Sequence, residues 1–113
     1  MLIAVYGTLR KCGALHGWLA DEEKVKYLGK DKLVGFGLYI YAGLPMVDWD
    51  EGEIVVEVYD VHPEIFVSID AMERGAGYRP IRVYTKYGWA TMWINHEAKK
   101  GRKVEGGDYC GGN

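Results

Sequence analysis

Residues 63–75, with the sequence PEIFVSIDAMERG, give the clearest helix signal in this 113-residue chain. Proline suits the first position of a helix, and Glu64 complements the positive end of the helix dipole. A glycine at position 75 or 77 is expected to end the helix. At roughly 100° per residue, four apolar side chains form one stripe that would face a core: Ile65, Phe66, Ile69 and Met72.

An acidic residue lies on the same side of this helix as the apolar stripe. On the helical wheel Glu73 falls between Ile69 and Phe66, so its carboxylate is expected to point along the buried face. Burial and the negative end of the helix dipole both raise the pKa of a carboxyl group toward neutrality, where a general acid or base works best. The positive charge of the next residue, Arg74, would instead lower the pKa of this carboxyl group. The pattern predicts that Glu73 is a catalytic acid or base.

Two alternatives to a catalytic Glu73 remain open at this point. The side chain could turn to solvent, or it could pair with an arginine such as Arg79 or Arg82. Asp70, at the edge of the stripe, is the reserve candidate, although a solvated or capping role suits its position better.

Apolar runs on both sides of the helix predict strands. The apolar run Leu2–Tyr6 is followed by a glycine and predicts a short buried strand. A second strand is expected over Leu33–Tyr41. Two hairpins are expected, one on each side of the helix: Pro45–Trp49 with Glu53–Asp60 around the turn Asp50-Glu51-Gly52, and Tyr78–Lys86 with Trp89–Asn95 around Tyr87-Gly88. The remaining segments are expected to be a second short helix at Ala14–Glu23 and loop or frayed tail from about residue 100.

Composition excludes several classes of function. The formal net charge is −2, so nothing electrostatic favours nucleic acid or an anionic membrane surface, and no apolar run is long enough to span a bilayer. A single serine without a Gly-x-Ser-x-Gly motif argues against a serine hydrolase. The three histidines show no ligand spacing, so we expect no metal and no cofactor.

With no signal-peptide pattern, we expect a cytoplasmic protein in which Cys12 and Cys110 are reduced, although the two thiols could pair.

The first loop can supply the second component of a catalytic site. A strand that ends in Tyr6-Gly7-Thr8-Leu9 leaves successive backbone N–H groups unpaired. Such groups can hold a carboxylate or a developing oxyanion. By itself the motif is weak, because a strand followed by a glycine turn is common.

Taken together, these segments resemble the gamma-glutamylcyclotransferase-like family, which includes the gamma-glutamylamine cyclotransferases. The resemblance covers nearly the whole chain and rests on an ordered set of motifs: Val5-Tyr6-Gly7-Thr8-Leu9-Arg10, Gly37-Leu38-Tyr39, Gly43-Leu44-Pro45, Gly52-Glu53-Ile54, Ile69-Asp70-Ala71-Met72-Glu73, Tyr78 with the following arginines, and Gly107-Asp108-Tyr109. Arg74 and Tyr109 depart from the pattern, since many members carry Gly and Trp there.

The resemblance implies one α+β domain over residues 1–113: a small, mostly antiparallel, barrel-like sheet with about two helices and a cavity at one side. It implies that Tyr6, Gly7, Thr8 and Leu9 bind the glutamyl part of a substrate and that Glu73 is the catalytic acid/base. Tyr78, Arg79 and Arg82 could line the cavity. The expected partner is a small gamma-glutamyl amide, cyclised to 5-oxoproline with release of an amine. The alternative is a non-catalytic member that binds a small carboxylate or a protein.

Overall fold

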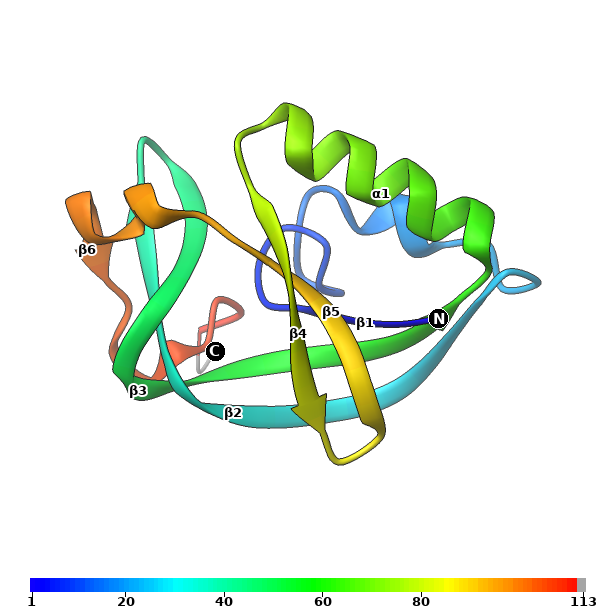
Figure 1. The fold of residues 1–113 in the computed structure, drawn as a ribbon, viewed down its shortest axis with the longest axis horizontal. Coiled ribbons are helices and arrows are strands. Elements are labelled where there is room, and N and C mark those ends of the chain that lie inside the picture. Colours follow the sequence, from blue (N-terminus) through cyan, green and yellow to red (C-terminus); the bar gives the residue numbers. More distant parts are fainter. Residues whose placement is uncertain (112–113) are drawn as a thin grey trace.

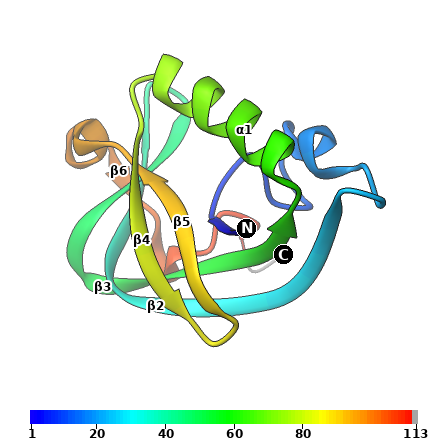
Figure 2. The ribbon, with the colours of Figure 1, turned by 45° about the vertical axis from the view of Figure 1, so that its right-hand side comes forward.

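A computed structural model describes residues 1–111 as one curled sheet with a helix across its open side (Figure 1). The six strands follow the order β4-β5-β1-β3-β2-β6. All neighbouring pairs are antiparallel except β1 (Leu2–Val5) with β5 (Gly88–Ile94). Figure 2 shows how far the sheet curls around its interior. The expected α+β, barrel-like, mostly antiparallel fold is confirmed.

Two long strands form most of the sheet. β2 (Val25–Tyr41) and β3 (Leu44–Val61) pair from Val25↔Val61 to Tyr41↔Leu44. Their connection is the two-residue turn at residues 42–43, where both residues have positive φ, as the tight turns of β-hairpins require.

The first hairpin predicted from the sequence is wrong. Residues 50–52 lie inside β3, which runs unbroken through them. The pairing passes from Val34↔Glu53 to Phe36↔Trp49, so residues 50–52 of β3 lie opposite a single residue of β2 and form a bulge rather than a turn. A bulge bends the strand and increases its twist, which helps the sheet to curl.

The predicted helix is confirmed, and so is the second predicted hairpin, although its turn lies one residue earlier than the expected Tyr87-Gly88. β4 (Arg79–Thr85) pairs with β5 around the turn at residues 86–87. Helix α1 spans Pro63–Gly75, with Pro63 in its first turn, and Gly77 has the left-handed φ of +92° that ends many helices. Ile69 is fully buried, and the rest of the apolar stripe packs into the same core cluster. This packing places the last turn of α1 over the end of β1.

The remaining segments differ from expectation. A single 3-10 turn, η1 (His16–Leu19), replaces the helix expected over Ala14–Glu23. The segment expected to be loop and tail contains η2 (His96–Lys100), β6 (Arg102–Lys103) and η3 (Glu105–Gly107). Residues 112–113 of that segment lie outside the described residues. Among residues 1–111, no helix is both long and apolar enough to cross a membrane.

Candidate active site

A cavity of about 110 Å³ lies where the end of β1, the last turn of α1 and the start of β3 meet. It brings together Glu73, the loop at residues 6–9 and Tyr78, all of which the sequence had singled out. The remaining lining residues are mostly apolar: Ala4, Val5, Leu15, Leu44, Pro45, Met72, Ala76 and Trp93.

Glu73 is the one acidic side chain that lines this cavity within the described residues. It is half-buried on the last turn of α1, and burial raises its pKa from 4.5 to about 7. No described residue forms a salt bridge with it, so the pairing with Arg79 or Arg82 does not occur. A carboxyl group with this pKa exchanges a proton readily near neutral pH.

Two buried tyrosines line the cavity beside Glu73. The Tyr6 hydroxyl donates a hydrogen bond to the Trp93 carbonyl (2.7 Å), and the Tyr78 hydroxyl donates to the Pro45 carbonyl (2.9 Å). Burial first, and then the charge of Glu73, raise the pKa of Tyr78 to about 12. Burial also raises the pKa of Tyr6. Both hydroxyl groups therefore stay protonated and neutral. Each hydroxyl hydrogen is used in the hydrogen bond to a backbone carbonyl.

The loop after β1 has unpaired backbone donors at the cavity. The N–H groups of Gly7, Thr8 and Leu9 have no hydrogen-bond acceptor within residues 1–111. The carbonyl groups of this loop are paired: that of Gly7 accepts from Arg10 N (2.9 Å) and that of Thr8 from Leu15 N (2.9 Å). Successive backbone amides without a partner are a type of group that can bind an anion.

Gly7 is required by close packing across the loop. A Cβ atom at this position would lie 2.6 Å from Pro45 Cγ, well inside van der Waals contact. The start of β3 therefore packs directly on the loop backbone and holds it at the cavity wall.

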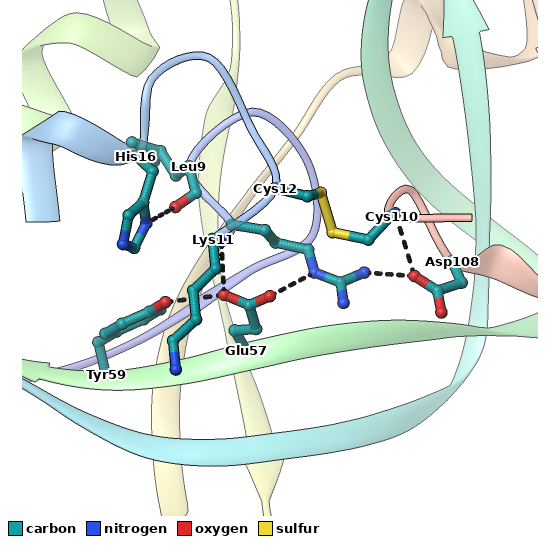
Figure 3. Close-up of polar contacts among 9 residues, drawn as sticks. Leu9, Lys11, Cys12, His16, Glu57, Tyr59, Asp108 and Cys110 are labelled. Atoms are coloured by element: carbon teal, nitrogen blue, oxygen red, sulfur yellow. Dashed lines mark hydrogen bonds and ion pairs between the residues drawn. A yellow bond between two sulfur atoms is a disulfide. The ribbon is translucent and has the colours of Figure 1, made fainter. Parts of the chain in front are cut away.

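A buried ion-pair network supports the loop from behind. Arg10 is only 1% exposed; its Nε donates to Glu57 Oε2 (2.9 Å) and its Nη1 to Asp108 Oδ1 (2.6 Å). Glu57 Oε1 accepts from the backbone N of Lys11 (2.9 Å) and the hydroxyl of Tyr59 (2.7 Å), as Figure 3 shows. Burial alone would raise the pKa of Glu57. The hydrogen bonds to its carboxylate, chiefly the one from Arg10, instead hold this pKa below its ordinary value. The network fixes the loop to β3 and to the C-terminal segment.

Sequence reasoning missed the role of this network. Its signal was Glu57 itself, the one charged residue in the apolar run Ile54–Tyr59. A charge inside a buried strand needs a partner of opposite sign, and Arg10 in the first loop is that partner.

A disulfide joins Cys12 to Cys110 beside the network (Figure 3). The expectation that both thiols are reduced is therefore wrong. The Cα atoms lie 5.8 Å apart because the C-terminal segment returns across the sheet to the first loop. This contact is non-local, so the positions of the two cysteines in the sequence do not reveal it.

Three further candidate residues lie outside the cavity. Arg79 is exposed and its Nη2 contacts His96 Nε2 (2.7 Å), while Arg82 is exposed with its guanidinium over the Trp89 ring. The suggestion that these arginines line the cavity is wrong. Asp70 accepts from Trp93 Nε1 (2.9 Å) and pairs with a neighbouring arginine, and the indole hydrogen bond lowers its pKa.

Within the described part of the chain, no three side chains of His, Cys, Asp or Glu come together as metal ligands. The polar groups at the cavity are the carboxyl group of Glu73, the hydroxyl groups of Tyr6, Thr8 and Tyr78, and the unpaired backbone N–H groups of residues 7–9.

The chain is similar to several known proteins. The family model described as gamma-glutamyl cyclotransferase, AIG2-like, matches residues 3–111. A Pyrococcus horikoshii protein named "putative gamma-glutamylcyclotransferase" is 41% identical over 107 residues, which is 95% of this chain and 89% of that protein. The crystal structure of that protein has a TM-score of 0.87 at 40% identity, covering 96% of this chain and 89% of the other. The solution structure of YtfP from Escherichia coli has a TM-score of 0.75 at 30% identity, with 96% of each chain covered. The chain belongs to the gamma-glutamyl cyclotransferase, AIG2-like family.

Proposed function

We propose that this protein is a gamma-glutamyl cyclotransferase, which converts a gamma-glutamyl amide into 5-oxoproline and a free amine. One observation carries the proposal: a half-buried Glu73 with a pKa of about 7 lines the same small cavity as three unpaired backbone N–H groups. The family membership and the similarity to the Pyrococcus protein support it.

In the first step, the ionised carboxylate of Glu73 takes a proton from the α-ammonium group of the substrate. The freed nitrogen attacks the γ-carbonyl carbon, forms the ring C–N bond and places negative charge on the carbonyl oxygen. Because nucleophile and electrophile belong to one molecule, the cavity needs only to hold the chain folded. Well-oriented intramolecular attack can supply about 7–11 kcal/mol of the barrier.

In the second step, the bond between the γ-carbon and the original amide nitrogen breaks. Glu73 returns its proton to this leaving nitrogen and then transfers a second proton from the ring nitrogen in the same way. The ring nitrogen keeps one hydrogen, and the amine leaves as an ammonium ion, so protons and charge balance. One carboxyl group that titrates near neutrality serves as both base and acid.

The loop amides can hold either negatively charged group of the reacting substrate, the α-carboxylate or the oxyanion. Loss of one oxyanion donor typically lowers kcat about 10²- to 10³-fold. Tyr6 and Tyr78 offer only lone pairs to the cavity, because their hydrogens point to backbone carbonyls. They can accept a hydrogen bond from the substrate ammonium group.

The test measures 5-oxoproline released from a set of gamma-glutamyl amides by wild type and by Glu73→Gln. We expect turnover of at least one amide by wild type and a loss of about 10²- to 10⁴-fold in the variant, the range typical of general acid–base catalysis. The matched control is Glu64→Gln on the first turn of the same helix, where the exposed side chain pairs with Lys24. This control should retain full activity.

Two results would contradict the proposal. Full activity in Glu73→Gln would remove the proposed acid/base. A rise in Tm on adding a gamma-glutamyl amide, without product from any substrate, would indicate the alternative of a non-catalytic binding protein.

A further inference from the structure

The disulfide between Cys12 and Cys110 lies at the surface of the protein, although the ion pair between Arg10 and Glu57 beside it is buried (Figure 3). Cys12 is exposed and Cys110 is half-buried, whereas Arg10 is only 1% exposed. Exposed disulfides are more easily reduced than buried ones, and they are the ones that serve as regulatory bonds. A dithiol reductant can therefore reach this bond in the folded protein.

The disulfide supports a weak non-covalent contact between the C-terminal segment and the first loop. Within residues 1–111, and apart from the disulfide, one hydrogen bond joins residues 108–111 to the rest of the chain: Arg10 Nη1 donates to Asp108 Oδ1 (2.6 Å). The Asp108 side chain is 33% exposed, so water competes for this bond. Tyr109 adds partial packing against the core. A short terminal segment held in this way frays when its covalent bond is cut.

Cys12 belongs to the same compact loop as the unpaired amides at the cavity. Two hydrogen bonds fold this loop back on itself, from Arg10 N to the Gly7 carbonyl (2.9 Å) and from Gly13 N to the Arg10 carbonyl (2.7 Å). Gly13, the next residue after Cys12, packs so closely that a Cβ atom there would overlap the carbonyl of Thr8. A carbonyl and the N–H that follows it share one rigid peptide plane. A shift of the Thr8 carbonyl therefore turns the next N–H group at the cavity.

We propose that the Cys12–Cys110 disulfide is a reversible redox switch for the first loop. The oxidised form holds the C-terminal segment against Arg10 and keeps the loop amides in place at the cavity. The reduced form releases this segment and leaves Arg10 with only Glu57 of its two carboxylate partners. The effect on turnover rests on the proposed cyclotransferase function, whereas the effect on the loop does not.

The reductant is a dithiol, which supplies two electrons and two protons. One of its thiolates attacks the sulfur of Cys12, the more exposed of the two residues. The S–S bond breaks, and Cys110 leaves as a thiolate that takes up a proton. The second sulfur of the dithiol then attacks the mixed disulfide, so that Cys12 is released as a thiol and the reductant becomes an intramolecular disulfide. The same exchange in reverse, with a disulfide as the oxidant, restores the bond.

The first test measures backbone motion by ¹⁵N relaxation, including relaxation dispersion, before and after reduction with dithiothreitol. Rigid backbone has an order parameter of about 0.85, and flexible backbone lies below about 0.6. We expect residues 108–111 to fall below about 0.6 on reduction. Residues 7–13 should show lower order parameters or new relaxation dispersion, and reoxidation with glutathione disulfide should reverse both changes. Strands β4 and β5 are the internal control and should stay near 0.85, which shows that the reduced protein is folded.

The second test measures 5-oxoproline release from a gamma-glutamyl amide by oxidised, reduced and reoxidised protein. A misplacement of about 1 Å at a catalytic site can cost about 10²-fold in rate. We therefore expect kcat/KM to fall about 10- to 100-fold on reduction and to recover on reoxidation. The matched control carries both Cys12→Ser and Cys110→Ser. It should have the low activity of the reduced protein and should not respond to dithiothreitol.

The outcomes separate this inference from the proposed function. Unchanged motion in residues 7–13 after reduction would overturn the switch, and so would a bond that resists dithiothreitol in the folded protein. Loss of order in β4 and β5 to the same degree would show general unfolding and would also overturn it. If no amide is turned over in either form, the cyclotransferase proposal fails, while relaxation still decides whether the loop responds. If turnover is found with equal kcat/KM in both forms, the function stands and the switch is overturned.

Discussion

Replacing Glu73 with glutamine should make the protein more stable, and by an amount that depends on pH. Burial raises the pKa of Glu73 from 4.5 to about 7. Each pKa unit corresponds to about 1.4 kcal/mol, so ionising this group in the folded protein lowers the free energy of unfolding by roughly 3 kcal/mol. Because part of the side chain reaches solvent, the measured effect should fall below this figure.

The direction of the pH dependence follows from which state holds the proton more tightly. Glu73 holds its proton more tightly in the folded protein than in the unfolded chain. The stability of the protein is therefore greatest below pH 4.5, the pKa of Glu73 in the unfolded chain, and it declines as the pH rises through about 7. Glutamine cannot ionise. The difference in free energy of unfolding between Glu73→Gln and wild type should therefore be smallest near pH ~4.5 and grow to as much as ~3 kcal/mol above pH ~7.5.

Urea denaturation at a series of pH values, with the disulfide intact, measures this difference. Glu64→Gln is the control of opposite sign, because the hydrogen bond and charge of Lys24 lower the pKa of Glu64. The native Glu64 contributes stability once ionised, so its variant should lose stability relative to wild type as the pH rises through the acid range. A difference for Glu73→Gln that stays constant with pH, or that grows as the pH falls, would refute the reasoning from burial.

Four more outcomes are expected. The kcat/KM for 5-oxoproline release should rise with pH and level off above about 7, as Glu73 ionises; a rate that falls over this range would contradict a base role. Arg10→Met leaves two carboxylates without their cation and should cost about 3–5 kcal/mol in urea denaturation, with a cost below ~1 kcal/mol showing that the network is dispensable. Changing both Cys12 and Cys110 to serine should lower the free energy of unfolding by about 2–4 kcal/mol, and an unchanged Tm would speak against the bridge. Gly7→Ala places a Cβ 2.6 Å from a proline carbon and should cost about 1–3 kcal/mol, together with activity; a variant as active as wild type would show that the loop can shift freely.

The elements that could be predicted from the sequence are those defined by local signals. The apolar period of residues 63–75 identified α1, and the same wheel placed Glu73 on the face that the structure half-buries. The alternation and turn residues of 78–95 identified the β4–β5 hairpin. In these segments the periodicity and the capping residues agree with the tertiary packing.

The wrong predictions concern features that depend on contacts between residues far apart in the sequence. Asp50-Glu51-Gly52 has the composition of a turn, and only its pairing with the distant β2 shows that it is a bulge. Arg79 and Arg82 are near Glu73 in sequence, but both side chains are exposed and the cavity is lined by other residues. The contact between the first loop and the C-terminal segment depends on the path of the whole chain, so the disulfide has no local signature. Glu57 signals that a buried charge needs a partner, but the local sequence does not show that Arg10 is that partner.

The bridge between Cys12 and Cys110 has a consequence for how the chain responds to cleavage. The two cysteines are 98 positions apart in the sequence, so the bridge turns nearly the entire polypeptide into a macrocycle. A protease that cuts once within this ring, for example at the turn of residues 86–87, produces two pieces that remain one covalent molecule. Such a nicked species would migrate as full-length protein on a non-reducing gel and separate into fragments only after a thiol reagent is added.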